Sequence, residues 1–317
     1  MSNRSRALRG AAVAALWAGA IGAAGAGLAR RYRRELGAAR ARLAAVDRKV
    51  VTTGFGDVEY VERGTGEPVL VSHGIFQSSE SVLLFGELFP GRRVIALSRF
   101  GYLGSNLPPK ATPAGQADAY AELLDALGIL ALDVVGISAG TTSVFQLVLR
   151  NPGRVKHLVV LSGNLPGSTT AVVQAGWARI VNRQPPLWVI KAVAPSTLAL
   201  LAGVPKRLAM TSDEARFVAA FLDSLFPVTP RIHGVDFDAF VSNADVNGYP
   251  LENLTVPTLL IHAKDDPLVS YQAAQRAVAR IPGARLVSLE SGGHLMLGQT
   301  GTVRDELDSF LGQRETP

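Results

Sequence analysis

Cysteine is absent from all 317 residues of the chain. Its absence excludes a disulfide framework, thiolate metal sites and thiol redox chemistry. The cellular compartment stays open, because a chain of this length that is 48% hydrophobic can bury a large core without covalent links. The length suits one large α/β domain with an inserted subdomain, or two small domains.

Acidic residues are scarce in the first fifty positions. This tail holds eleven Arg or Lys residues against Glu35 and Asp47, a net charge of +9. Since the whole chain carries +6, the remainder holds 21 basic and 24 acidic residues and is slightly negative, at −3. A body of that charge offers no basic stripe to a phosphate backbone, so nucleic acid is not expected as a partner.

Charge of either sign is missing from residues 10–29, which arginines flank on both sides. Twenty helical residues can just cross a bilayer, although this run is mostly Ala and Gly. We expect a single membrane anchor. A signal peptide cleaved near Ala24 or Ala26, which would lead to secretion, and a soluble or peripheral helix remain as alternatives. The arginine count favours a cytoplasmic location for the C-terminal side of the run, but both ends are basic.

A short apolar run, Leu132–Ile137, ends in the five residues Gly136-Ile137-Ser138-Ala139-Gly140, and a helix-compatible segment, Val144–Arg150, comes next. In a G-x-S-x-G turn the serine hydroxyl is exposed at the apex, and the glycines leave room for the neighbouring strand and helix. The N–H of Ala139, at the start of the helix, could stabilise an oxyanion. The pattern predicts a nucleophilic Ser138; a tight turn that merely contains serine is the alternative.

Three further motifs come directly after apolar, strand-like runs. They are His73–Ser79, Ala263–Val269 and Ser291–Met296. Together with the serine turn, and in this order along the chain, they resemble the serine α/β-hydrolases, and the resemblance spans about Val51 to Leu311. It implies an α/β-hydrolase fold, with a mostly parallel central sheet, helices on both faces and an inserted helical cap.

The resemblance also implies roles for residues of this chain. Ser138 would be the nucleophile, Asp266 the acid and His294 the base, in the order that this fold uses. The backbone N–H groups of Ile75 and Ala139 would form the oxyanion hole. No metal or organic cofactor is required by such a site.

The acid has to be assigned by register, because the motif departs from the family's Gly-x-x-Asp-x-x-Val-Pro. Ala263 replaces its glycine and Ser270 its proline. Counting from Ala263 selects Asp266, and the adjacent Asp265 is the alternative.

Other residues near these motifs receive structural or lining roles. His73 resembles the family's loop-holding histidine, and His262, inside a strand, is expected to be buried and hydrogen-bonded. Arg99 comes after Ser98, where family members commonly have Asp. We interpret it as fixing its loop; pairing with a carboxylate, or lining the site entrance, is the alternative. Phe76 and Met296 are predicted to line the substrate pocket.

Two strands, Val50–Thr53 and Val58–Arg63, are predicted to form a hairpin. Thr112 is predicted to start an amphipathic helix that stops at Gly128, and a further helix is predicted over Tyr271–Arg280.

Strands alternate with helices up to residue 163, and there the alternation ends. From Gly163 to about Leu254 no bounded strand is apparent. We predict several short helices, separated by prolines, at 172–180, 187–193, 198–208 and 214–225. We predict a tail at 1–49, a hydrolase core at 50–163 and 255–317, and a helical cap at 164–254. The cap is rich in Trp and Phe, which indicates an apolar substrate.

The sequence thus predicts a serine hydrolase that cleaves carboxylic esters of small to medium apolar acyl or aromatic substrates through an acyl-enzyme. A cofactor-free haloperoxidase or a carbon–carbon bond hydrolase could use the same residues. Outside catalysis, the fold could serve as a receptor for a hydrophobic ligand, and the tail could be a membrane tether. The oligomeric state is left open.

Overall fold

The computed structural model describes residues 25–168 and 178–312. It divides into two units, 1–45 and 46–317. In the first unit, residues 25–44 are helical. Most of the predicted membrane segment, residues 10–24, lies outside the described residues. Within the described part of the chain, no helix combines the length and apolar character needed to span a bilayer.

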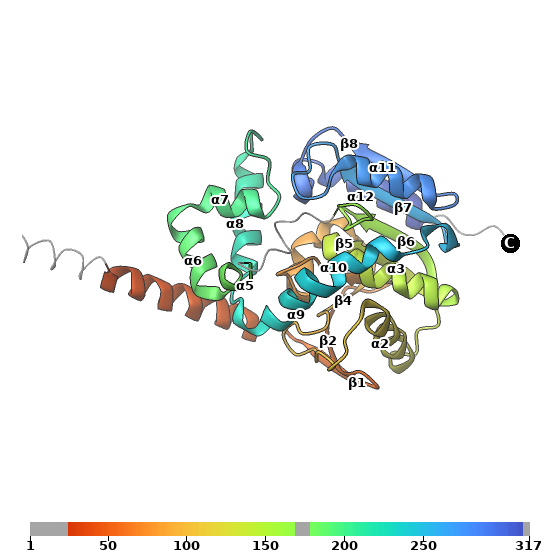
Figure 1. Cartoon of the computed structure of the whole chain (residues 1–317), viewed down its shortest axis with the longest axis horizontal. Helices are drawn as coiled ribbons and strands as arrows, with labels where there is room; N and C mark the ends of the chain where they lie inside the picture. The colour runs from red at the N-terminus through yellow and green to blue at the C-terminus, as the bar shows by residue number, and fades with distance from the viewer. Residues whose placement is uncertain (1–24, 169–177, 313–317) are drawn as a thin grey trace, which may run out of the picture. The chain divides into compact units, whose positions relative to one another are not determined.

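The second unit is built on an eight-stranded sheet in the order β1-β2-β4-β3-β5-β6-β7-β8 (Figure 1). β1 and β2 form the predicted antiparallel hairpin, β2 pairs antiparallel with β4, and all other pairs are parallel. The strands are β1 Lys49–Thr53, β2 Gly56–Arg63, β3 Pro68–Ser72, β4 Arg93–Leu97, β5 Leu132–Ile137, β6 Val155–Leu161, β7 Thr258–Ala263 and β8 Arg285–Leu289.

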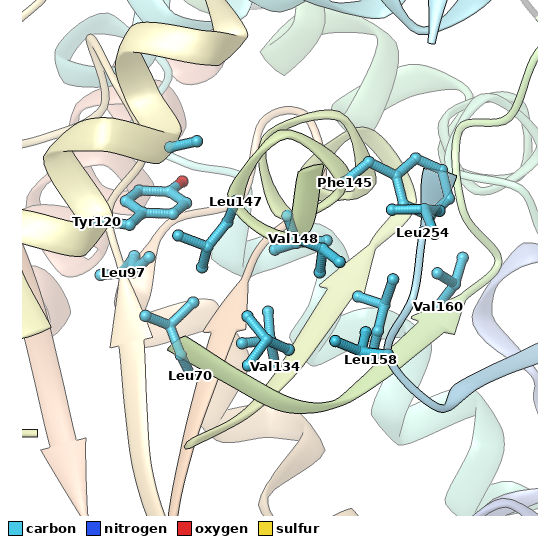
Figure 2. Packing of buried hydrophobic residues seen from close by; sticks show 14 of the residues in the cluster. Leu70, Leu97, Tyr120, Val134, Phe145, Leu147, Val148, Leu158, Val160 and Leu254 are labelled. Atoms are coloured by element: carbon cyan, nitrogen blue, oxygen red, sulfur yellow. The ribbon is translucent and has the colours of Figure 1, made fainter. Parts of the chain in front are cut away.

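One face of the sheet is covered by α2 Pro113–Ala126, α3 Thr141–Arg150 and α11 Tyr271–Arg280. Figure 2 shows Leu147 and Val148 of α3 packed over Leu70 and Val134, which come from neighbouring strands. Successive strand residues point to opposite faces, so alternate positions form this core. The predicted bounds of α11 and the predicted Thr112 cap of α2 are confirmed.

The other face of the sheet is covered by α12 Thr300–Leu311, a helix that was not predicted from the sequence. His157 of β6 points to this face, because it alternates with Leu158 of the first core. Its ring meets that of Phe310 edge-on, with centroids 5.3 Å apart. Helices therefore cover both faces, as expected.

Between β6 and β7 the described chain is helical, as predicted for the cap. Figure 1 shows α6, α7 and α8 grouped together. The elements are α5 Ala178–Val181, α6 Gln184–Val193, α7 Pro195–Leu201, α8 Ser212–Ser224, η4 Thr229–Arg231, α9 Ile232–Phe237, η5 Asp238–Ser242, α10 Asn243–Asp245, η6 Val246–Gly248 and η7 Leu251–Asn253. Most of the helix predicted at 172–180 lies outside the described residues.

The helix predicted over Leu198–Leu208 is shorter than expected: α7 ends at Leu201. Gly203 has φ +90°, a left-handed conformation that stops a right-handed helix. Elsewhere in the second unit, short helices form connections: η1 Ser79–Leu88, η2 Ser138–Gly140, η3 Pro152–Arg154 and η8 Gly293–Leu295.

Candidate active site

The turn after β5 holds Ser138 in a left-handed conformation, with φ +50°, directly before α3. A Cβ on Gly136 would lie 2.6 Å from Val144 Cγ2, and one on Gly140 would lie 2.1 Å from the carbonyl oxygen of Ser72. Both glycines are therefore needed for close packing, as predicted from the motif. The serine is half-buried.

His294 and Ser138, which lie 156 residues apart in sequence, are joined by a hydrogen bond. The distance from His294 Nε2 to Ser138 Oγ is 2.8 Å, and that from His294 Nδ1 to Asp266 Oδ2 is also 2.8 Å. The three side chains lie just beyond the carboxyl ends of three parallel strands, β5, β7 and β8, which places them at one edge of the sheet. This is the arrangement of a nucleophile, a base and an acid that orients the base.

Asp266 is buried and fully hydrogen-bonded. Its Oδ1 accepts the backbone N–H groups of Leu268 and Val269, at 2.8 and 3.0 Å. Burial opposes ionisation, but the charge and hydrogen bond of His294, together with the Val269 N–H, outweigh it and hold the Asp266 pKa below its usual value. An ionised Asp266 selects the His294 tautomer whose Nε2 can accept the serine proton.

Asp265, the alternative acid, points elsewhere. Its two carboxylate oxygens accept the backbone N–H groups of Gly292 and Gly293, at 3.3 and 2.8 Å. The geometry therefore places Asp266, and not Asp265, against the His294 ring.

The loop after β3 lies directly beside Ser138. A Cβ on Gly74 would come within 3.1 Å of Ser138 Cβ. The Gln77 side chain accepts the Gly74 N–H at 2.9 Å and so fixes this loop. Ile75, the next residue, is half-buried, and within the described part of the chain no hydrogen bond engages its N–H. Ala139 follows the serine and is the second residue of η2, within the first turn, where N–H groups lack intrahelical acceptors.

The two other predicted histidines have structural partners. His73 is buried, with Nδ1 bonded to the Gly74 carbonyl at 2.7 Å and Nε2 accepting the Arg99 N–H at 3.0 Å. Burial, with the charge of Arg99, holds the His73 pKa well below its usual value. His262 bonds the Val269 carbonyl at 3.0 Å, and burial lowers its pKa. Both predicted structural roles are confirmed.

Phe76 and Met296 are the predicted lining residues. Phe76 lies in the loop after β3, and Met296 lies two residues after His294. Both have left-handed backbones, with φ +65° and +52°. Phe76 is half-buried and Met296 is buried. Contact with substrate stays a prediction for both.

Two buried ion pairs join the cap to core loops. Arg99 makes a two-point contact with Asp238, at 2.8 and 2.6 Å, and both side chains are 0% exposed. Tyr102 donates to the same carboxylate at 2.6 Å. The second pair joins Arg231 to Glu80. Arg99 therefore pairs with a carboxylate, one of the roles that the sequence left open for it, and it also donates to the His73 carbonyl oxygen at 3.4 Å, which fixes the loops. Glu80 and Arg231 were missed.

The part of the chain that the structure describes contains no group of three or more His, Cys, Asp or Glu side chains that could hold a metal ion.

Known proteins with similar sequences and structures share an α/β-hydrolase fold with this chain. The family model described as alpha/beta hydrolase fold matches residues 67–299. The 2-hydroxymuconate semialdehyde hydrolase of Pseudomonas putida is 29% identical over 258 residues, which are 78% of this chain and 88% of that protein.

Two solved structures have a similar architecture. An alpha/beta hydrolase fold protein from Nakamurella multipartita superposes with a TM-score of 0.68 and 28% identity, over 84% of this chain and 99% of that one. An esterase from Exiguobacterium antarcticum gives a TM-score of 0.64 at 19% identity, with the same coverage, and indicates the fold alone. The predicted fold class is confirmed.

Proposed function

This chain belongs to the α/β-hydrolase fold family, and from that premise we propose that it is a serine hydrolase that cleaves carboxylic esters through an acyl-enzyme. The observation that supports this most is the hydrogen-bonded series Ser138, His294 and Asp266, with both links at 2.8 Å. A hydroxyl, an imidazole and a buried carboxylate in this order are the groups that acyl transfer needs.

In the proposed mechanism, Ser138 Oγ attacks the ester carbonyl carbon while His294 Nε2 takes the hydroxyl proton. The negative charge that develops on the carbonyl oxygen is received by the N–H groups of Ile75 and Ala139. Each such donor contributes about 3–4 kcal/mol to the stabilisation of the transition state. The intermediate then collapses, and the alcohol leaves with the proton held by His294.

Deacylation repeats these steps with water. His294 takes a proton from a water molecule, the hydroxide attacks the acyl carbon, and Ser138 leaves with the proton returned to Oγ. Asp266 compensates the imidazolium charge in both halves of the reaction.

We propose apolar acyl or aromatic groups as the substrate class. Aromatic side chains of the cap support this: Trp188, Phe221 and Phe226 are buried there. Phe85 of η1 packs edge-on against Phe217 and Phe221 of α8, which brings the apolar cap against a core loop. An apolar enclosure favours apolar ligands.

Carbon–carbon bond hydrolysis is the second candidate. It is favoured by the similarity to a hydrolase whose name specifies a semialdehyde of hydroxymuconate, a substrate class without an ester group. The same serine, histidine and oxyanion donors can serve either cleavage, so substrate preference has to be measured.

The test is hydrolysis of p-nitrophenyl esters of increasing acyl length, and separately of 2-hydroxymuconate semialdehyde. Wild-type protein is compared with Ser138→Ala and with the control Ser162→Ala. Ser162 also has a left-handed backbone, at φ +45°, and its buried hydroxyl has no hydrogen-bond partner in the described part of the chain. We expect ester turnover that is lost in Ser138→Ala and kept in Ser162→Ala.

Other outcomes would change the proposal. Turnover of the semialdehyde alone would select the second candidate. Ester turnover that survives in Ser138→Ala would contradict the serine mechanism. A folded wild type that turns over neither substrate, and that a fluorophosphonate does not label at Ser138, would favour a ligand receptor.

For the tail we propose membrane association through residues 10–29, with secretion after signal cleavage as the alternative. The supporting observation is the uncharged run flanked by arginines. Full-length protein should sediment with membranes after carbonate washing, and a variant lacking residues 1–34 should not. A soluble full-length protein would contradict the anchor, and a mature N-terminus near residue 26 would indicate a signal peptide.

A further inference from the structure

Three consecutive backbone N–H groups of the turn that carries His294 donate hydrogen bonds to residues outside the turn. The N–H groups of Gly292 and Gly293 donate to the Asp265 carboxylate, at 3.3 and 2.8 Å. The N–H of His294 itself donates to the carbonyl oxygen of Gly203, at 2.9 Å. Two of the acceptors thus come from the acid turn after β7 and the third from the cap.

This turn needs such acceptors because its backbone is unusual. Gly292 and Gly293 have φ of +124° and +63°. Gly292 precedes η8 and Gly293 is its first residue, so their N–H groups have no acceptor within that short helix. Met296, two residues after His294, is also left-handed. Without external acceptors, the turn would lose the contacts that select this conformation over others.

The cap also restrains the turn by contact. A Cβ on Gly203 would lie 2.2 Å from His294 Cβ, and one on Gly293 would lie 2.3 Å from Pro205 Cδ. The cap segment containing Gly203 and Pro205 therefore lies against the histidine turn with no room for even one additional methyl group.

We propose that Asp265 and Gly203 are positioning residues for the base: together they fix the His294 turn so that its imidazole reaches both Ser138 and Asp266. This inference rests on the proposed serine mechanism. It assigns Asp265 a role distinct from that of the neighbouring acid, and it makes the cap part of the catalytic framework as well as a cover.

The first test is Asp265→Ala, compared with Asp265→Asn. The alanine variant leaves two N–H groups without their acceptor, whereas asparagine keeps one acceptor oxygen. Since a displacement of about 1 Å in a catalytic group can cost 10²-fold in rate, we expect kcat to fall roughly 10–100-fold in Asp265→Ala, with KM changed less than about 3-fold. Asp265→Asn should lie between this variant and wild type.

The matched control is Glu122→Ala. Glu122 likewise accepts the backbone N–H of a loop glycine, Gly54, at 2.6 Å, but in the β1–β2 hairpin. Its loss should leave kcat unchanged. To separate positioning from folding, kcat is expressed per site titrated by a fluorophosphonate, because a role confined to folding would reduce the number of sites and not the rate at each.

The second test concerns the cap contact and compares Gly203→Ala with Gly283→Ala. Both glycines are left-handed, at φ +90° and +68°, so alanine introduces similar backbone strain. A Cβ on Gly283 meets nothing within 4 Å, whereas one on Gly203 meets His294. We expect Gly203→Ala to lower kcat per site by at least 10-fold and to slow fluorophosphonate labelling, and Gly283→Ala to do neither.

The outcomes separate this inference from the proposed function. If Ser138→Ala abolishes turnover but Asp265→Ala and Gly203→Ala keep wild-type kcat per site, the positioning roles are refuted and the serine mechanism stands. If Ser138→Ala retains turnover, the serine mechanism itself is wrong.

Discussion

Removing the charge of Asp238 provides a stringent test of how the cap is attached. Asp238→Asn keeps the shape of the side chain, and its amide oxygen can still accept a hydrogen bond from the Tyr102 hydroxyl. The variant loses the negative charge opposite Arg99, whose guanidinium lies 2.6 and 2.8 Å from the carboxylate oxygens. Both side chains are 0% exposed, so water cannot replace the missing partner.

Because the pair is buried, the stability lost in Asp238→Asn should be large. Two unit charges about 3 Å apart attract by about 5 kcal/mol at an effective dielectric constant near 20. Breaking a buried pair by removing one partner typically costs about 3–5 kcal/mol, because the other charge stays uncompensated. For a body of this size that corresponds to a fall in Tm of roughly 6–10 °C.

The structure offers a matched control two residues away. Asp236 also makes a two-point contact with an arginine, Arg183, at 3.1 and 3.0 Å, but these side chains are 33% and 40% exposed. Asp236→Asn should therefore cost less than about 1 kcal/mol. The double variant Arg99→Met with Asp238→Asn should recover stability relative to Asp238→Asn alone, because no uncompensated charge is then buried at this site.

Urea unfolding monitored by circular dichroism measures all three variants. Equal free energies of unfolding for Asp236→Asn and Asp238→Asn would refute the reasoning, and so would a double variant less stable than Asp238→Asn. Either result would mean that the Arg99 guanidinium is solvated or compensated in another way.

Two further predictions concern the acid and the pH dependence of stability. Asp266→Asn should lower kcat by about 10³–10⁴-fold, because the amide favours the wrong His294 tautomer; a steady-state loss below tenfold would contradict its role. The pKa of His73 is held well below 6.5 in the folded chain, chiefly by burial. Just below pH 6.5 the imidazole is therefore protonated in the unfolded chain and neutral in the folded chain. The free energy of unfolding should then decrease as the pH falls below about 6.5, by up to roughly 1.4 kcal/mol per pH unit for this group. His73→Gln should reduce that slope. Some slope should remain, because burial also lowers the His262 pKa. An unchanged slope in urea titrations at pH 5 to 7 would contradict this.

Local sequence was sufficient for elements whose conformation depends on nearby residues. The turn at Ser138 is one: its flanking glycines are required by contacts with the adjacent strand and helix, and the five-residue motif carries that requirement. The helix Tyr271–Arg280 was predicted with its observed bounds. In the structure Ser270 caps its first turn and alanines line its buried side, and both are local features of the sequence.

Other features could not be predicted, because their sequence signals are weak or depend on contacts with distant residues. The helix α12 begins at Thr300 without a side-chain cap, so its start is not marked. Register alone favoured Asp266 over Asp265, and only the hydrogen bonds of the folded chain distinguish the contacts of the two carboxylates.

The sequence by itself determined the α/β fold class, the helical character of the described cap and the residues brought together beside Ser138. Only the tertiary structure decided which charges meet in the interior. Arg99 and Asp238 are 139 residues apart, and Glu80 and Arg231 are 151 apart. Such pairings depend on how the cap packs onto the loops of the core, and no local pattern encodes a contact that forms only when distant elements exclude water together.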